Sequence, residues 1–290
     1  MDNFSIDEHP DLHDPIGIVA FTGWNDAANA ASDAAHFVAK NLKAQRFASL
    51  KEESFYDFTK TPPSVSISSS GIRTLNWPSP EFYFVSQSDL ERDLIIAIAA
   101  EPDLRWRTFS QSYVDLFESF NVSLVISLGA LLTESSHRRP IHIAGSSPNL
   151  DIEQRLRFPR SSYEGPTGIL GVLNSALQQA DVPAISLWAS VPHYIVETCP
   201  PATLALLKKI ESITDIHLDT SELNFSCERF YETTDTTLEA DPTLREYVRL
   251  IEESTVEDSI DTSDGNKKPL DAEEILSDVE QFFRDQQDDL

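Results

Sequence analysis

The chain has only two cysteines, Cys199 and Cys227, among its 290 residues. They stand far apart and outside any Cys-x-x-Cys spacing, which argues against a disulfide framework and against a thiolate zinc site. The seven histidines form no His-Glu-x-x-His pattern, so the chemistry of zinc hydrolases is not expected either. We therefore predict neither a metal site nor a bound cofactor.

Long apolar runs are also missing. The longest candidates, residues 94–100 and 122–132, are well short of the roughly 20 residues that a membrane-spanning helix needs. The first 14 residues are acidic and lack the basic start and apolar centre of a signal peptide. We therefore expect a cytoplasmic protein without a membrane partner.

Positive charge is scarce, and the excess of negative charge is unevenly placed. The chain has 22 lysines and arginines against 48 acidic residues, which gives a net charge of -26. Residues 211–290 hold 24 of the acidic residues and 6 of the basic ones, a net charge of -18. Such a surface repels the phosphates of nucleic acids and anionic lipids at long range. We do not expect a nucleic-acid partner, and a basic protein surface is a better candidate.

Short, fully apolar segments alternate with segments of helical periodicity. Residues 16–21, 94–100, 122–128 and 183–189 have the continuous apolar character of strands buried on both faces of a parallel sheet. The segments between them carry apolar residues at the spacing of helices, and residues 45–85 are predicted to form an antiparallel excursion. This order predicts an α/β fold, a three-layer α/β/α sandwich around a mostly parallel sheet.

Three regions follow from the same pattern. Residues 1–14 lack periodicity and are predicted to be a flexible arm, and residues 15–213 form the α/β/α domain. Residues 214–290 are predicted to be an acidic, helical region with a mobile linker near residues 253–269. The last helix carries Phe282 and Phe283 on one stripe, and we expect both phenylalanines at an interface.

The segment "FTGWNDAANA" predicts a turn between a strand and a helix. Its single glycine, Gly23, does not meet the pattern of a Walker loop or of a dinucleotide-binding loop. Asn25 and Asp26 are placed to cap the next helix, where a carboxylate competes with a bound phosphate. We favour a structural corner with Trp24 at an interface, and ligand binding by Asn25 and Asp26 is the alternative.

The loops after the other strands supply further candidates. His137, Arg138 and Arg139 follow a buried strand, and paired arginines can clamp a carboxylate or phosphate, or pair with acidic groups of the tail or of a neighbouring subunit. We assign His137 and Arg138 to a candidate ligand site and Arg139 to an interface. The other candidates are two ligand-binding residues and one interface residue: Arg105, His193 and Trp106. No Gly-x-Ser-x-Gly elbow accompanies the histidine.

An ordered set of segments resembles a known family. The segments are "GWNDAANAAS" (23–32), "FYDF" (55–58), "EPDLRW" (101–106), "LGALLTESSHRRP" (128–140), "YEGPTGILGVL" (163–173) and "SLWASVPHY" (186–194). Through them the chain is similar to the proteasome assembly chaperone two-like family, in particular its actinobacterial branch. The resemblance implies an α/β/α sandwich like those of phosphorylases and peptidyl-tRNA hydrolases. It also implies homo-oligomers, of which the trimer is one candidate, and no established catalytic activity.

Two functions are therefore weighed. The first is a non-catalytic, homo-oligomeric interaction protein with the role of an assembly chaperone and an unidentified protein partner. The second is an enzyme or a binder of nucleoside-type or phosphate-type ligands at the loops after the strands. The missing catalytic motif and the acidic tail favour the first function, and they leave catalysis open.

Overall fold

The computed structural model describes residues 3–68, 71–87, 90–149, 152–153 and 165–260. The chain divides into two compact units, Met1–Arg245 and Glu246–Leu290. The sequence placed the boundary at residue 213, before the acidic region. That boundary is displaced because helix α6 (Ser221–Ala240) belongs to the larger unit, where Leu223 and Phe230 pack against its core.

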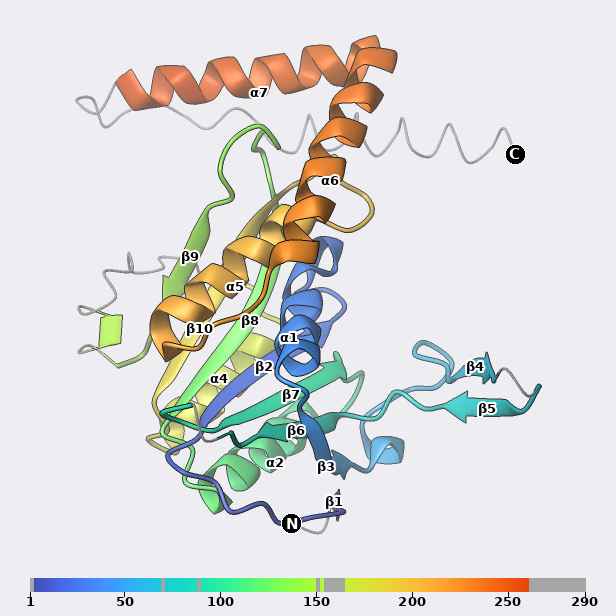
Figure 1. Ribbon diagram of the computed structural model, residues 1–290, viewed down its shortest axis with the longest axis vertical. Helices are drawn as coiled ribbons and strands as arrows, with labels where there is room; N and C mark the ends of the chain where they lie inside the picture. The colour runs from blue at the N-terminus through green and yellow to red at the C-terminus, as the bar shows by residue number, and fades with distance from the viewer. Residues whose placement is uncertain (1–2, 69–70, 88–89, 150–151, 154–164, 261–290) are drawn as a thin grey trace. The chain divides into compact units, whose positions relative to one another are not determined.

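The larger unit contains a mixed sheet of eight strands (Figure 1). Their order across the sheet is β1 (Phe4–Ile6), β3 (Gln45–Leu50), β6 (Glu81–Val85), β7 (Leu94–Ala100), β2 (Ile16–Thr22), β8 (Leu124–Thr133), β10 (Ala184–Pro192) and β9 (Ile143–Ser146). The four strands β7, β2, β8 and β10 run parallel. The strands outside them pair in antiparallel fashion. The α/β fold is confirmed, and the predicted parallel character holds for the centre of the sheet.

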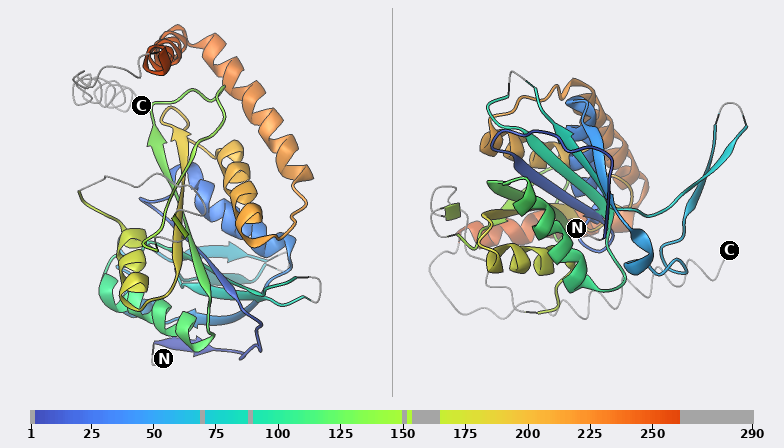
Figure 2. Two further views of the ribbon diagram at one scale, coloured as in Figure 1. Left: turned by 90° about the vertical axis from the view of Figure 1, so that its left-hand side faces the viewer. Right: turned by 90° about the horizontal axis from the view of Figure 1, so that it is seen from below.

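Helices cover both faces of this sheet (Figures 1 and 2). The helices are α1 (Ala30–Asn41), α2 (Trp106–Ser119), α4 (Ile169–Gln179) and α5 (Pro200–Thr214). Along β2, Ile16 and Ile18 face the core shared with α1 and α5, whereas Val19 and Phe21 face the core shared with α2 and α4. Successive side chains of a strand point to opposite faces, so one apolar strand supplies both cores. This gives the three layers.

The predicted arm is wrong for residues 4–6. Strand β1 pairs with β3, and Phe4 is buried with its ring centroid 5.6 Å from that of Phe82. Three residues are too few to show the alternation of a strand, so the sequence pattern did not reveal this pairing.

The predicted mobile linker is wrong for residues 253–260. Helix α7 (Pro242–Ile260) includes them. The remainder of the linker, Phe282 and Phe283 lie outside the described residues. No helix within the described ranges is long and apolar enough to cross a membrane.

A separate hairpin consists of β4 (Ser64–Ile67) and β5 (Arg73–Asn76). It extends away from the main sheet, as Figure 1 shows. Two short 3-10 helices, Ala27–Asn29 and Glu52–Ser54, complete the named elements of the described ranges.

Candidate functional site

The carboxyl ends of β7, β2 and β8 meet at one edge of the sheet. Helix α1 follows β2 and covers one face, whereas α2 follows β7 and covers the other. In α/β proteins such a reversal opens a crevice beyond the strand ends, where ligands commonly bind. Asn25 and Asp26 follow β2 at this edge, as the sequence predicted, and Glu101 follows β7.

A buried side-chain network links this edge together. Asn25 is buried, and its Nδ2 donates to Glu101 Oε1 at 3.0 Å. The same oxygen accepts the backbone N–H of Ile169, the first residue of α4, at 2.9 Å. The backbone oxygen of Asn25 accepts from the N–H of Ala130 in β8 at 2.8 Å. The network therefore joins the ends of three strands to the start of a helix.

Asp26 occupies the start of α1. Its Oδ1 accepts the backbone N–H of Ala31 at 2.7 Å and that of Ser32 at 3.3 Å, and its Oδ2 accepts the Ser32 hydroxyl. Burial raises the pKa of Asp26, and these hydrogen bonds oppose the shift. The predicted capping role is thus present. The N-termini of α1 and α4 each hold a carboxylate of the chain, from Asp26 and Glu101, which an incoming phosphate would have to displace.

We expect Gly168→Ala to disturb this network. An added Cβ would lie 2.4 Å from Asn25 Nδ2 and 2.5 Å from its Oδ1, so the amide must move away from Glu101. The expected loss in the free energy of unfolding, measured by urea denaturation, is about 1 to 2 kcal/mol. Asn25→Ala provides the control because it removes the clashing amide. If the costs of Gly168→Ala and Asn25→Ala simply add in the double variant, the proposed clash is absent.

A second polar network surrounds His137, in the loop after β8. Tyr194 follows β10, and its hydroxyl accepts the His137 backbone N–H at 2.7 Å and lies 2.7 Å from His137 Nδ1. His137 Nε2 lies 3.3 Å from Oδ1 of Asp235 on α6. The neutral ring with its proton on Nε2 satisfies both partners, because the hydroxyl then donates to Nδ1 and Nε2 donates to the carboxylate.

Arg138 belongs to the same network. Its Nε and Nη2 donate to Asp235 Oδ1 at 3.0 and 2.7 Å, and this contact is the main reason why the pKa of Asp235 is lowered. Of the alternatives for the arginines, Arg138 therefore pairs with an acidic group of the region predicted as a tail. This pair helps to hold α6 beside the loops that follow β8 and β10.

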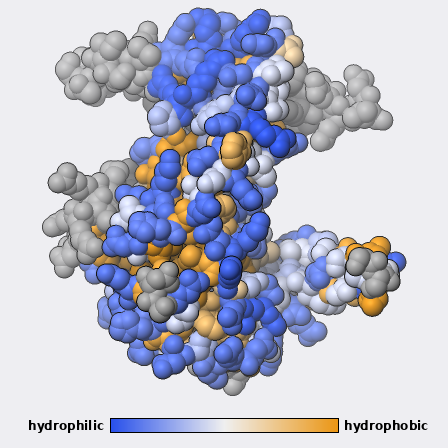
Figure 3. Space-filling view, viewed as in Figure 1, coloured by the Kyte–Doolittle hydropathy of each residue, from blue (hydrophilic) through white to orange (hydrophobic). Residues whose placement is uncertain are grey.

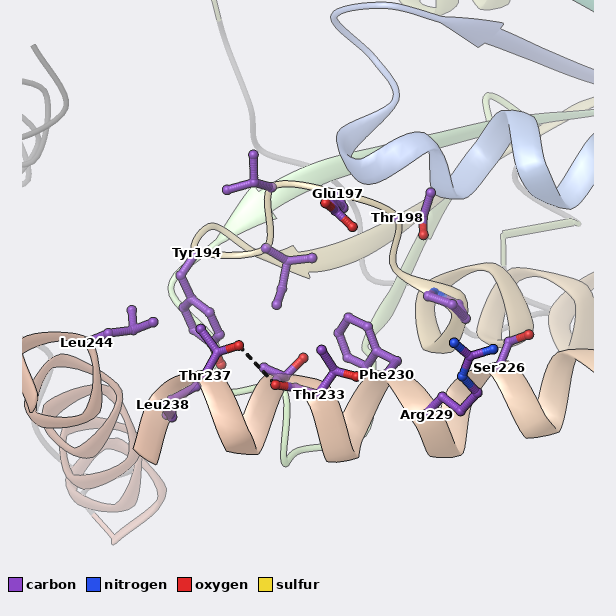
Figure 4. Close-up of a pocket in the computed structure, with 14 residues that line it drawn as sticks. Tyr194, Glu197, Thr198, Ser226, Arg229, Phe230, Thr233, Thr237, Leu238 and Leu244 are labelled. Atoms are coloured by element: carbon purple, nitrogen blue, oxygen red, sulfur yellow. Dashed lines mark hydrogen bonds between the residues drawn. The ribbon is translucent and has the colours of Figure 1, made fainter. Parts of the chain in front are cut away.

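A cavity of about 560 Å³ lies beside this network, within the larger unit. Tyr194 and Thr198 line it on one side, and Arg229, Thr233 and Thr237 from α6 line it on the other (Figure 4). The Thr237 hydroxyl donates to the Thr233 backbone oxygen at 3.0 Å. Sequence reasoning missed the cavity because α6 was assigned to a separate region. The threonines spaced three and four residues apart on that helix were its only signal.

The remaining predicted residues do not join one site. Arg105 is exposed at the start of α2, and half-buried His193 has Nδ1 3.4 Å from the Thr133 backbone oxygen. Trp24 is 70% exposed, whereas Trp106 is half-buried against the core and donates from Nε1 to the Pro102 oxygen. Arg139 is half-buried. The described contacts place the predicted ligand residues in two separate networks, one around Asn25 and one around His137.

The fold and this edge define a class of protein: a three-layer α/β/α protein in which the chain's own side chains occupy the strand ends. The family model described as PAC2 family matches residues 20–236. The chain belongs to the PAC2 family, which confirms the resemblance drawn from the sequence.

Solved structures agree with this assignment. A PAC2 family protein from Streptomyces avermitilis is 38% identical, with a TM-score of 0.76, covering 81% of this chain and 100% of its own. A Mycobacterium tuberculosis proteasome-assembly chaperone homologue is 33% identical, with a TM-score of 0.73, covering 80% of this chain and 99% of its own. The archaeal proteasome activator PbaB of Pyrococcus furiosus is 20% identical over 81% of this chain and 97% of its own; its TM-score of 0.66 supports the fold alone. A search of curated proteins gave no match.

Proposed function

We propose that the chain is a non-catalytic, homo-oligomeric protein of the cytoplasm that assists the assembly of a protein complex. The observation that carries this proposal is the occupied edge of the sheet. Asn25, Asp26 and Glu101 fill the position where an α/β enzyme commonly binds its ligand, and they spend their hydrogen bonds on one another and on two helix starts.

The relatives suggest the kind of partner. The Mycobacterium tuberculosis protein that is 33% identical is named a proteasome-assembly chaperone homologue. We therefore take unassembled proteasome α subunits as the first partner to test. The net charge of -26 favours a partner with a basic surface and predicts that binding weakens as salt rises.

The test mixes the full chain with α subunits of an actinobacterial proteasome. Native mass spectrometry should detect a complex of the two proteins, and the rate of ring formation should change when the chain is present. A matched acidic protein of unrelated fold serves as the control for charge alone. Absence of both a complex and a rate change at tens of micromolar would remove the proteasome partner.

The rival function is tested on the same protein by thermal shift. Phosphate, nucleosides and nucleotides are expected to leave the melting temperature unchanged. A ligand at 100 times its dissociation constant stabilises a protein by about 2.7 kcal/mol, which such a measurement detects easily. A shift that Asp26→Asn or Arg229→Gln abolishes would favour the small-molecule function and locate its site.

A further inference from the structure

The β4–β5 hairpin has one apolar face and one polar face. Val65 pairs with Leu75 and Ile67 pairs with Arg73, so these four side chains share a face. The opposite face carries only small or polar residues: Ser64, Ser66, Thr74 and Asn76. Such a division is typical of a sheet that has one face packed against apolar surface.

Nothing in the described part of this chain covers the apolar face. Val65, Ile67 and Leu75 are all exposed, with Ile67 at 67%. Figure 3 shows apolar surface on the projecting hairpin. The hairpin is fixed at its base, where the rings of Phe58 and Trp77 meet edge to face at 4.8 Å. A two-stranded hairpin is at best marginally stable in water, and an exposed apolar face marks an interaction surface.

The same chain carries an apolar surface of matching character. Four large exposed side chains lie at or just beyond the carboxyl ends of the neighbouring strands β2, β7 and β8, and we call them the edge patch: Trp24, Leu104, Leu131 and Leu132. Acidic residues accompany the patch in the same loops, among them Asp103 and Glu134.

Charge favours a second copy of this chain as the occupant of the hairpin face. Arg73 is the only charged residue between Ser64 and Asn76, so the hairpin is positive in a chain with a net charge of -26. A basic, apolar arm complements the acidic, apolar edge patch. Contact between two different surfaces of the same chain is head-to-tail, and such contacts close into rings when the rotation permits.

We propose that the apolar face of the hairpin in one copy docks on the edge patch of a second copy. This inference rests on the homo-oligomer of the proposed function and names the surfaces that form it. Trp24, predicted to lie at an interface, then has a defined partner in Val65, Ile67 and Leu75.

The experiment compares two double variants of the full chain by sedimentation velocity over a dilution series. Val65→Thr with Ile67→Thr removes apolar surface from the docking face, and should raise the dissociation constant of the oligomer at least tenfold. Ser64→Thr with Ser66→Thr introduces the same residue on the opposite face of the same strand, and should leave that constant unchanged. Threonine suits strands, so both variants keep the hairpin's propensity.

A patch variant makes the test independent of the hairpin's own folding. Trp24→Ser changes an exposed residue of the body and should weaken association to a similar extent. The patch variant has an intact hairpin, and the variant Val65→Thr with Ile67→Thr has an intact patch. Their mixture should therefore form a 1:1 dimer that neither variant forms alone. A symmetric contact between two hairpins or between two patches would give no such dimer and would overturn the proposal.

The outcomes separate this inference from the proposed function. A wild-type oligomer that Val65→Thr with Ile67→Thr leaves intact overturns the hairpin contact and keeps the homo-oligomer. A monomeric wild type removes both, while binding to proteasome α subunits is judged by its own experiment. If the wild type is monomeric and the hairpin variant loses α-subunit binding, the hairpin faces a different protein and the proposal fails.

Discussion

Asp26→Ala is expected to lower the free energy of unfolding by about 2 to 3 kcal/mol. The Asp26 carboxylate accepts two backbone N–H groups at the start of α1 and the hydroxyl of Ser32, and all of these atoms are shielded from water. Alanine leaves the two N–H groups of Ala31 and Ser32 without an acceptor in a buried place. Urea denaturation followed by circular dichroism measures the loss.

Asp26→Asn separates the hydrogen bonds from the charge. The asparagine side-chain oxygen can still accept from the N–H groups of Ala31 and Ser32, so its cost should stay within about 1 kcal/mol. Asp33→Ala is the matched control in the same first turn of α1, and an effect below about 0.5 kcal/mol is expected there. Equal losses for Asp26→Ala and Asp33→Ala would show that the buried cap contributes nothing particular.

The same residue sets a pH dependence. Because burial raises the pKa of Asp26, the folded protein keeps this proton to a higher pH than the unfolded chain, where the value is about 3.9. Between the two pKa values the folded state binds more protons, so the Asp26 contribution to stability falls as pH rises through that window. Asp26→Asn should remove this fall. Parallel stability curves for the wild type and Asp26→Asn from pH 4 upwards would contradict it.

The sequence predicted the parts of the fold that depend on local pattern. Strands β2, β7, β8 and β10 are continuous apolar runs, which is how strands buried on both faces appear in a sequence. The packing of α6 was not predicted because Leu223 and Phe230 are seven residues apart among acidic and hydroxyl side chains. Such a helix looks solvated until its neighbour is known.

The site divides in the same way. Asp26 as a cap follows from the rules for helix starts, and the structure shows it. Glu101 was expected to pair with Arg105, four residues along a predicted helix, yet its carboxylate faces Asn25 and the N–H of Ile169. Spacing rules reveal only local pairs. The meeting of His137 with Asp235 spans 98 positions, and only the assembled fold brings the two residues together.

Gly129→Val is expected to destabilise the protein by about 3 kcal/mol. Gly129 lies in β8, directly opposite Trp188 of β10 in the register of the two parallel strands. An added Cβ would come within 2.6 to 2.9 Å of three atoms of the Trp188 ring, closer than non-bonded carbon atoms approach. The indole is held in place because its Nε1 donates to the Ser186 hydroxyl at 2.9 Å.

The sign of this effect tests the register of the sheet. Valine is a better strand former than glycine, so β-propensity alone would make Gly129→Val stabilising by up to about 1 kcal/mol. The contact with Trp188 reverses that expectation. In a Trp188→Ala background the ring is absent, and most of the cost of Gly129→Val should disappear, which urea denaturation of the four proteins in the cycle measures. A stabilising Gly129→Val, or a cost that persists without the indole, would mean that Gly129 and Trp188 do not face each other.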